Sequence, residues 1–141
     1  MDKESMKEWS TISLRLALGI VFIMHGSQKL FGAFGGPGIS GFAGYLGNLS
    51  IPASGMLSII VAIVEFFGGL FVLLGLFTRY ASLLIAIDML VAFLAVHMKN
   101  GFFVGKGGFE VVMILFFISM ALAMSGSGKL SLEKILFKKG H

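Results

Sequence analysis

The most constraining feature of this chain is an apolar run from Met56 to Phe77 that contains one charged residue, Glu65, near its centre. The hydrocarbon core of a bilayer is about 30 Å thick, so a helix needs roughly 20 apolar residues to cross it. This run is apolar on all sides and lacks the polar face of a helix in a water-soluble protein. The run therefore predicts a transmembrane helix.

Glu65 is the exception within this run. An acidic side chain at mid-membrane costs about 2.5–3.5 kcal/mol on insertion scales, so Glu65 is expected to face other helices and to have a partner. Small residues recur at seven-residue spacing around it, as Ala62 with Gly69 and Gly68 with Gly75. Such residues let two helix backbones approach closely in lipid. The pattern predicts that Glu65 points into a tight helical bundle.

Composition supports a membrane protein over the whole chain. Of its 141 residues, 57% are hydrophobic and only 13% are charged, whereas soluble domains have about a quarter charged residues. Without cysteine the chain cannot supply a thiol relay, a disulfide, a c-type haem attachment or iron–sulfur ligands. Its net charge of +4 comes from cations scattered around apolar segments. These cations indicate membrane topology rather than a nucleic-acid partner.

The hydrophobic pattern predicts an all-α, polytopic membrane protein. We expect a single membrane domain over residues 1–141, with an antiparallel bundle of four transmembrane helices at about 10–31, 56–77, 80–98 and 109–124. The turns after the second and third helices are short, which makes sequential neighbours antiparallel.

The connection between the first two helices is rich in glycine. Residues 32–55 hold both prolines and eight of the 20 glycines, without a charged residue. A helical rhythm nevertheless runs through Ile39, Phe42, Tyr45, Leu46 and Leu49, which predicts a short amphipathic helix at the membrane surface. Two interpretations stay open, because such a segment can cover a cavity or serve as an interfacial anchor.

The distribution of cations predicts the orientation. With four spans, both chain ends lie on the side of the Thr78–Tyr80 turn. That side holds eight cations (Lys3, Lys7, Arg15, Arg79, Lys129, Lys134, Lys138 and Lys139), and the other side holds three (Lys29, Lys99 and Lys106). We therefore expect a protein of the plasma membrane, and the positive-inside rule places both of its termini on the cytoplasmic side.

Polar residues inside the predicted spans are candidates for function. His25, Glu65 and Asp88 are the candidate catalytic residues, as a proton relay in the outer half of the bundle. At least one of the two carboxyls is expected to pair with Arg15 or His25, because unpaired buried ions are costly.

Three further residues are predicted as structural charge partners: Arg15, Glu110 and His97. Glu110 has an alternative role as a helix cap. The whole set also has a structural interpretation, as a salt-bridge network that holds the helices together. A third interpretation makes His25 and His97 axial ligands of a haem b, but two histidines alone are weak evidence. We expect no metal site, because the Glu-x-x-His motif of di-iron bundles is absent.

Four sequence stretches carry a family resemblance: RLALGIVFIMHGSQKLFG, VEFFGGLFVLLGLFTR, GFFVGKGGFE and SGSGKLSLEKIL. In this order and spacing, the chain from Leu14 to Leu136 resembles the DoxX family of small four-helix bacterial and archaeal membrane proteins. Two departures are Gly126-Ser127-Gly128, where the family usually has Gly-Pro-Gly, and Glu133, where it often has aspartate.

The resemblance implies redox or stress metabolism. The family takes its name from a membrane subunit of thiosulfate:quinone oxidoreductase, and relatives are linked to oxidative, thiol or catechol stress. The resemblance supplies no secure set of catalytic residues, and the chain has no glycine-rich dinucleotide motif. Redox chemistry would therefore use a lipid-soluble carrier or a second oxidoreductase subunit.

The preferred hypothesis is a quinone-linked oxidoreductase subunit in the lipid bilayer. His25 and Lys29 would donate hydrogen bonds to a quinone, with Phe22 and Phe66 beside its ring. Phe67 is a further candidate neighbour. Two alternatives are a non-catalytic scaffold for a soluble oxidoreductase and a small-molecule carrier or channel. A homo-oligomer is compatible with each of them.

Overall fold

The computed structural model describes residues 1–137, and these residues form helices and connecting turns without a strand. The α-helices are α1 (Lys3–Phe31), α2 (Gly38–Asn48), α3 (Ser54–Leu74), α4 (Thr78–Ala92), α5 (Glu110–Ser125) and α6 (Leu132–Leu136). A π-helical turn, η2 (Phe93–His97), and the 3-10 turn η3 (Met98–Asn100) extend α4. The two remaining 3-10 turns are η1 (Ala33–Gly35) and η4 (Val104–Lys106).

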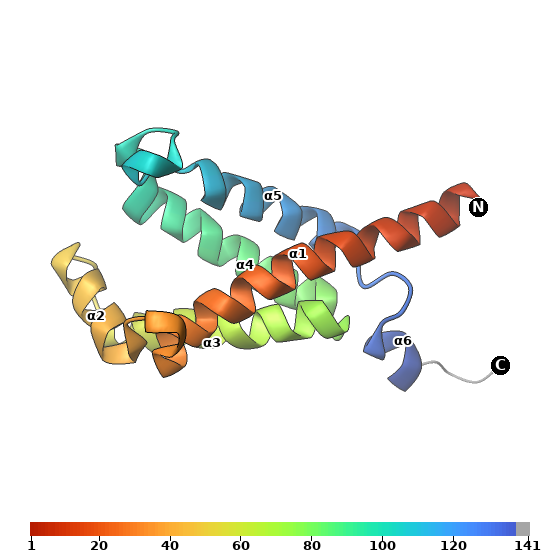
Figure 1. Cartoon of the computed structure of the whole chain (residues 1–141), viewed down its shortest axis with the longest axis horizontal. Helices are drawn as coiled ribbons and strands as arrows, with labels where there is room; N and C mark the ends of the chain where they lie inside the picture. Colours follow the sequence, from red (N-terminus) through yellow and green to blue (C-terminus); the bar gives the residue numbers. More distant parts are fainter. Residues whose placement is uncertain (138–141) are drawn as a thin grey trace.

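The four long helices form two pairs (Figure 1). α1 packs along α3, and α4 packs along α5. The start of α1, the α3–α4 turn, the end of α5 and the short α6 lie at one end of the molecule. α2 and the α4–α5 loop lie at the other end, where the two pairs diverge.

Within residues 1–137, three helical stretches are long and apolar enough to cross a membrane: Lys3–Phe31, Ser54–Leu74 and Thr78–Asn100. α5 is apolar but shorter, with 16 residues. The prediction of an all-helical protein with apolar helices suited to a membrane is therefore confirmed.

The helix ends differ from the predicted ends where local capping decides them. α1 begins at Lys3, earlier than expected, because the carboxylate of Asp2 accepts a hydrogen bond of 2.7 Å from the backbone N–H of Ser5. α3 ends at Leu74, because Gly75 adopts the left-handed conformation that closes a helix. Thr78 then belongs to the start of α4.

Glycines let α1 and α3 approach each other closely. A Cβ atom added at Gly69 would lie 2.7 Å from the backbone nitrogen of Ile23, and one added at Gly26 would overlap the backbone of Phe66. Gly69 has the close-packing role that its spacing predicts. The core beside this contact is formed by Leu18, Phe22, Val72, Ile85 and Leu122.

Arg15 is buried, but its partners are not the acidic side chains predicted for it. Its guanidinium donates hydrogen bonds to the carbonyl oxygens of Val72, Leu73, Ser127, Lys129 and Leu130, over 2.9–3.3 Å. These carbonyls belong to the last turn of α3 and to the segment after α5. The guanidinium has five N–H donors in one plane, so it can bind several carbonyl oxygens at once without a carboxylate partner. Arg15 therefore ties the C-terminal segment to the α1–α3 pair.

Candidate functional site

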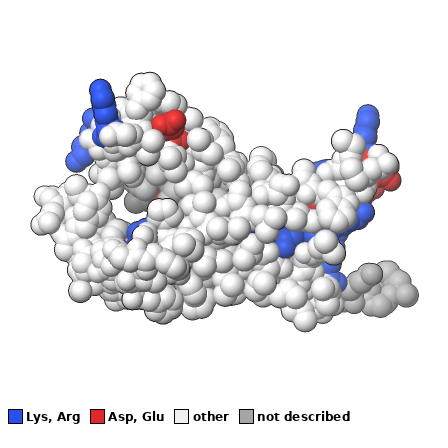
Figure 2. Space-filling model, in the orientation of Figure 1, with Lys and Arg blue, Asp and Glu red and all other residues white. Residues whose placement is uncertain are grey.

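A cavity of about 590 Å³ opens between the two helix pairs at the end that carries α2. Figure 2 shows this hollow at the left of the molecule. Its walls are mostly apolar and come from every long helix, for example through Val21, Phe22, Leu46, Val61, Met89 and Val112. The polar residues His25, Lys29, Glu65 and Asp88 line the same cavity. The structure thus brings together the residues predicted for proton transfer.

An ion pair between α1 and α3 lies in the cavity wall. The Lys29 ammonium is 2.6 Å from the Glu65 carboxylate, whose side chain is 5% exposed. The same ammonium lies 5.2 Å from the ring centre of Phe42 in α2, within the range of a cation–π contact. Glu65 is therefore buried, as predicted, but its charged partner is Lys29.

The close approach of α1 and α3 explains this pairing. Gly26 lies against the backbone of Phe66, the residue that follows Glu65. Lys29 is one helical turn beyond Gly26, so it is on the same side of α1. Its long side chain then reaches Glu65 directly.

Asp88 of α4 supplies a second carboxyl to the cluster. It lies close enough to Glu65 and Lys29 for their charges to interact. Its Oδ2 atom is buried and has no hydrogen-bond partner within residues 1–137. Two ionised carboxylates beside one ammonium leave one negative charge in excess, which one bound proton would balance. The arrangement suits a group that accepts and releases protons.

The predicted pairing of a carboxyl with Arg15 or His25 is wrong within the described residues. Glu65 pairs with Lys29, and Arg15 binds carbonyl oxygens at the far end of the molecule. His25 lines the cavity with an exposed side chain and forms no ion pair with either carboxyl. The count of charges correctly indicated that Glu65 has a charged partner, but the packing of α1 on α3 determines that this partner is Lys29.

Glu110 and His97 also differ from their predicted role as charge partners. Glu110 lies in the first turn of α5, and its carboxylate accepts a hydrogen bond of 3.0 Å from the backbone N–H of Val104 in η4. The Nδ1 atom of His97 lies 2.8 Å from the carbonyl oxygen of Gly107. Both side chains therefore form hydrogen bonds with the backbone of the α4–α5 loop. His97 and His25 line the same cavity, which keeps the haem hypothesis open to test.

The two predicted aromatic neighbours of a ligand separate in the structure. Phe22 is buried in the cavity wall. Phe66 instead makes edge-to-face contacts with Phe31 and Phe67, and neither it nor Phe67 lines the cavity. The successive residues Glu65, Phe66 and Phe67 project in different directions from α3, so only the first reaches the cavity.

Phe42 and Tyr45 of α2 line the cavity, as do Val104 and Gly107 of the α4–α5 loop. The helical rhythm of the glycine-rich connection predicts a short helix that contains the first two and can cover a cavity, and the structure has α2 there. Val104 and Gly107 were missed. The loop gave no such signal, because its position depends on the divergence of the helix pairs.

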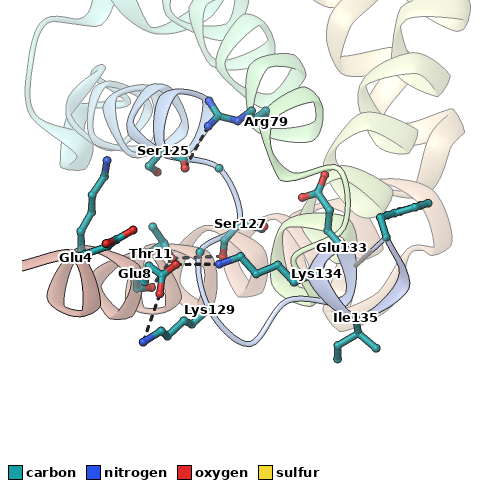
Figure 3. Close-up of a pocket in the computed structure, with 14 residues that line it drawn as sticks. Glu4, Glu8, Thr11, Arg79, Ser125, Ser127, Lys129, Glu133, Lys134 and Ile135 are labelled. Carbon is teal, nitrogen blue, oxygen red and sulfur yellow. Dashed lines mark hydrogen bonds and ion pairs between the residues drawn. The ribbon is translucent and has the colours of Figure 1, made fainter. Parts of the chain in front are cut away.

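A second, open groove lies at the opposite end, between the start of α1 and the segment that includes α6 (Figure 3). Glu8 pairs there with Lys134 at 2.9 Å and with Lys129 at 3.4 Å. Arg79 donates hydrogen bonds to the last carbonyls of α5. The Glu8 contacts join the start of α1 to the segment after α5, and the Arg79 contacts join α4 to the end of α5. Lys138 and Lys139, which contribute to the predicted charge asymmetry, lie outside the described residues.

Residues 10–98, which include the Lys29–Glu65 pair and Asp88, match the model of the DoxX family. The chain belongs to the DoxX family. This confirms the resemblance noted in the sequence.

Three relatives cover nearly the whole chain. A Bacillus subtilis (strain 168) protein named "Putative oxidoreductase CatD" is 31% identical, over 93% of this chain and 90% of its own length. The "Uncharacterized membrane protein Rv3486" of Mycobacterium tuberculosis is 34% identical, over 92% and 83%. An uncharacterised protein of Haemophilus influenzae is 28% identical, over 96% and 97%. No solved structure matches this DoxX-family chain significantly.

Proposed function

We propose that this protein is the quinone-binding membrane subunit of an oxidoreductase. One observation carries the proposal: a single cavity with apolar walls also contains His25, Lys29, Glu65 and Asp88. Ligand sites typically combine an apolar surface with a few convergent polar groups, and this cavity has that composition.

The cavity residues fit the chemistry of a quinone headgroup. Its ring and tail need apolar walls, which Phe22, Val61 and Met89 provide. Its carbonyl oxygens need donors, which Lys29 and His25 supply. The buried Oδ2 atom of Asp88 is free within the described residues to exchange a proton or hydrogen bond with a ligand.

The proposed reaction takes two electrons from a reductant held by a partner subunit and two protons, and converts quinone to quinol. This chain binds and orients the ring and supplies protons through Glu65 and Asp88. The ion pair with Lys29 holds the Glu65 carboxylate in place during this exchange. The printed name of the Bacillus subtilis relative, an oxidoreductase, supports redox chemistry of this kind.

The same proposal includes a topology. α1, α3, α4 and α5 are four antiparallel spans of the plasma membrane, with both termini in the cytoplasm. The excess of cations at that end supports this orientation. The glycine-rich connection, with α2, then covers the outer mouth of the cavity, and the reductant is delivered from the outer side.

The direct test is the organic extract and absorption spectrum of gently purified protein. We expect co-purified quinone in the wild type and a loss of quinone in His25→Ala. A haem absorption band would instead support the bis-histidine alternative. Absence of quinone, together with unchanged quinone reduction after addition of candidate partner subunits, would contradict the proposal. A scaffold or carrier would then be the better account.

A carrier and a scaffold predict different experiments. A carrier moves a small molecule into liposomes without any electron acceptor. A scaffold keeps its role when His25, Glu65 and Asp88 are replaced together. The proposed subunit should fail both tests.

A further inference from the structure

His97 makes a hydrogen bond that fixes the state of its ring. Its Nδ1 atom lies 2.8 Å from the carbonyl oxygen of Gly107, which also accepts a hydrogen bond of 3.1 Å from the side-chain amide of Asn100. A carbonyl oxygen can only accept, so the proton of a neutral His97 ring is on Nδ1. Nε2 is then an unprotonated acceptor.

His97 is also placed between the charged cluster and the outside. It lines the same cavity as Asp88, and it follows Asp88 by nine residues on the same helical stretch, which is about 13 Å at 1.5 Å per residue. It is the last residue of the π-helical turn η2, a kind of turn that occurs frequently at functional sites.

The loop that supports the His97 ring is held by several contacts. The backbone N–H of Phe109 donates to the carbonyl oxygen of Gly101 over 2.9 Å, which closes the α4–α5 loop on itself. The ring of Phe109 packs edge-to-face on Phe93, in η2. A Cβ atom at Gly108 would overlap the backbone of residues 101–102, so the loop is closely packed against itself.

The bond to Gly107 survives protonation of the ring. Nδ1–H donates to the carbonyl oxygen in both the neutral and the charged state of histidine. Nε2 can therefore bind and release a proton without loss of the ring's orientation. A histidine held in this way by a second group is a common arrangement in proton transfer.

We propose that His97 is the proton relay at the outer mouth of this cavity. Nε2 takes up protons one at a time from the outer aqueous phase and releases them into the cavity, where Asp88 and Glu65 deliver two of them to the quinone as the two electrons arrive. The relay rests on the proposed function, because quinone reduction supplies the electrons that the protons accompany. The protonation of the neutral His97 ring on Nδ1 does not depend on that function. The other titratable groups that line the cavity are His25, Lys29, Tyr45, Glu65 and Asp88.

The first test observes the ring itself, without turnover. Protein labelled with nitrogen-15 in histidine, in lipid nanodiscs, is studied by NMR across the pH range in which histidine titrates, with His97→Asn used to assign the signals. We expect a neutral His97 ring with its proton on Nδ1 and none on Nε2. A neutral ring with its proton on Nε2 would overturn the inference whatever the protein's activity.

The second test separates proton transfer from support of the loop. In His97→Asn, the side-chain amide can replace Nδ1–H as donor to Gly107 but cannot relay protons, whereas His97→Ala loses both functions. In the reconstituted complex with its partner subunit, we expect both variants to lower quinone turnover by about a hundredfold. Imidazole added on the outer side should restore much of that turnover.

The outcomes of this second test are distinct. Wild-type turnover in His97→Asn with loss only in His97→Ala would show a structural role and overturn the relay. Loss in both variants without rescue by imidazole would also contradict it. If the wild-type complex itself shows no quinone turnover while the NMR result holds, the proposed function fails and the assigned state of the His97 ring stands.

Discussion

The ammonium of Lys29 and the carboxylate of Glu65 lie 2.6 Å apart and join α1 to α3 inside the cavity wall. The two side chains are 18% and 5% exposed, so both are largely removed from solvent. A buried ion pair contributes little net stability by itself, but loss of one partner leaves an uncompensated charge. Single and double substitutions of Lys29 and Glu65 should therefore differ strongly in stability, which makes them a sensitive test of this ion pair.

We expect Lys29→Met to destabilise the protein by about 3–5 kcal/mol, because Glu65 then keeps a buried charge without its partner. Glu65→Leu should be more harmful than Glu65→Gln, since glutamine retains the shape and can still accept a hydrogen bond from Lys29. The double variant Lys29→Met with Glu65→Leu should recover much of the loss. Thermal unfolding in detergent measures all four proteins. Additive losses in the double variant would show that the two charges do not interact.

Gly26 should tolerate no side chain. In Gly26→Ala the new methyl group would overlap the backbone of Phe66 and push α1 away from α3, at a cost of about 1–3 kcal/mol. It should also weaken the contact between Lys29 and Glu65. Gly44→Ala is the matched control, because Gly44 lies in α2 and a Cβ atom there meets no atom of the described residues within 4 Å. Equal unfolding temperatures for the two variants would contradict the close contact.

Arg15→Lys should loosen the C-terminal segment although it conserves the charge. A lysine cannot reproduce the planar donors that serve carbonyl oxygens of α3 and of residues 127–130 at once. We expect a loss of at least about 3 kcal/mol, as two or more charged hydrogen bonds are lost. Limited proteolysis should then cleave after Ser125 more rapidly. Unchanged protection would indicate that Arg15 is not what holds the segment.

Single cysteines can test the topology, because the chain has none of its own. Tyr45→Cys, at the cavity end, should react with an impermeant thiol reagent added to intact cells. Lys139→Cys is the inner-side position chosen from the sequence, but it lies outside the described residues, so Ile135→Cys in α6 serves as a structurally defined equivalent. Neither inner position should react until the cells are opened. The reverse pattern would invert the proposed orientation.

The sequence predicted the helices because length and hydrophobicity determine them locally. It also predicted that Glu65 is buried, since a lone carboxyl in an apolar run has no other favourable place. It did not predict which cation pairs with Glu65, because the choice of Lys29 over Arg15 depends on the close contact at Gly26. The predicted acidic partner of Arg15 was wrong for a related reason. Arg15 binds backbone carbonyl oxygens at the end of α3, and a count of charged side chains does not include these groups.

The cavity itself could not be derived from the sequence. It exists because the α4–α5 pair diverges from the α1–α3 pair at the end that carries α2, and this divergence depends on the packing of all four long helices (Figure 1). The role of His97 depends equally on the α4–α5 loop, which brings Gly107 to within 2.8 Å of the ring.

Photo-crosslinking with an azido-quinone tests the central claim most directly. The purified protein in nanodiscs is illuminated with the probe, and the labelled peptides are identified by mass spectrometry with and without excess unlabelled quinone. We predict labels on the cavity wall, in α2 and between Val104 and Val112, that disappear with the competitor and weaken in Lys29→Met. Labels confined to outward-facing residues such as Leu83 and Leu84, and unaffected by the competitor, would contradict quinone binding in this cavity.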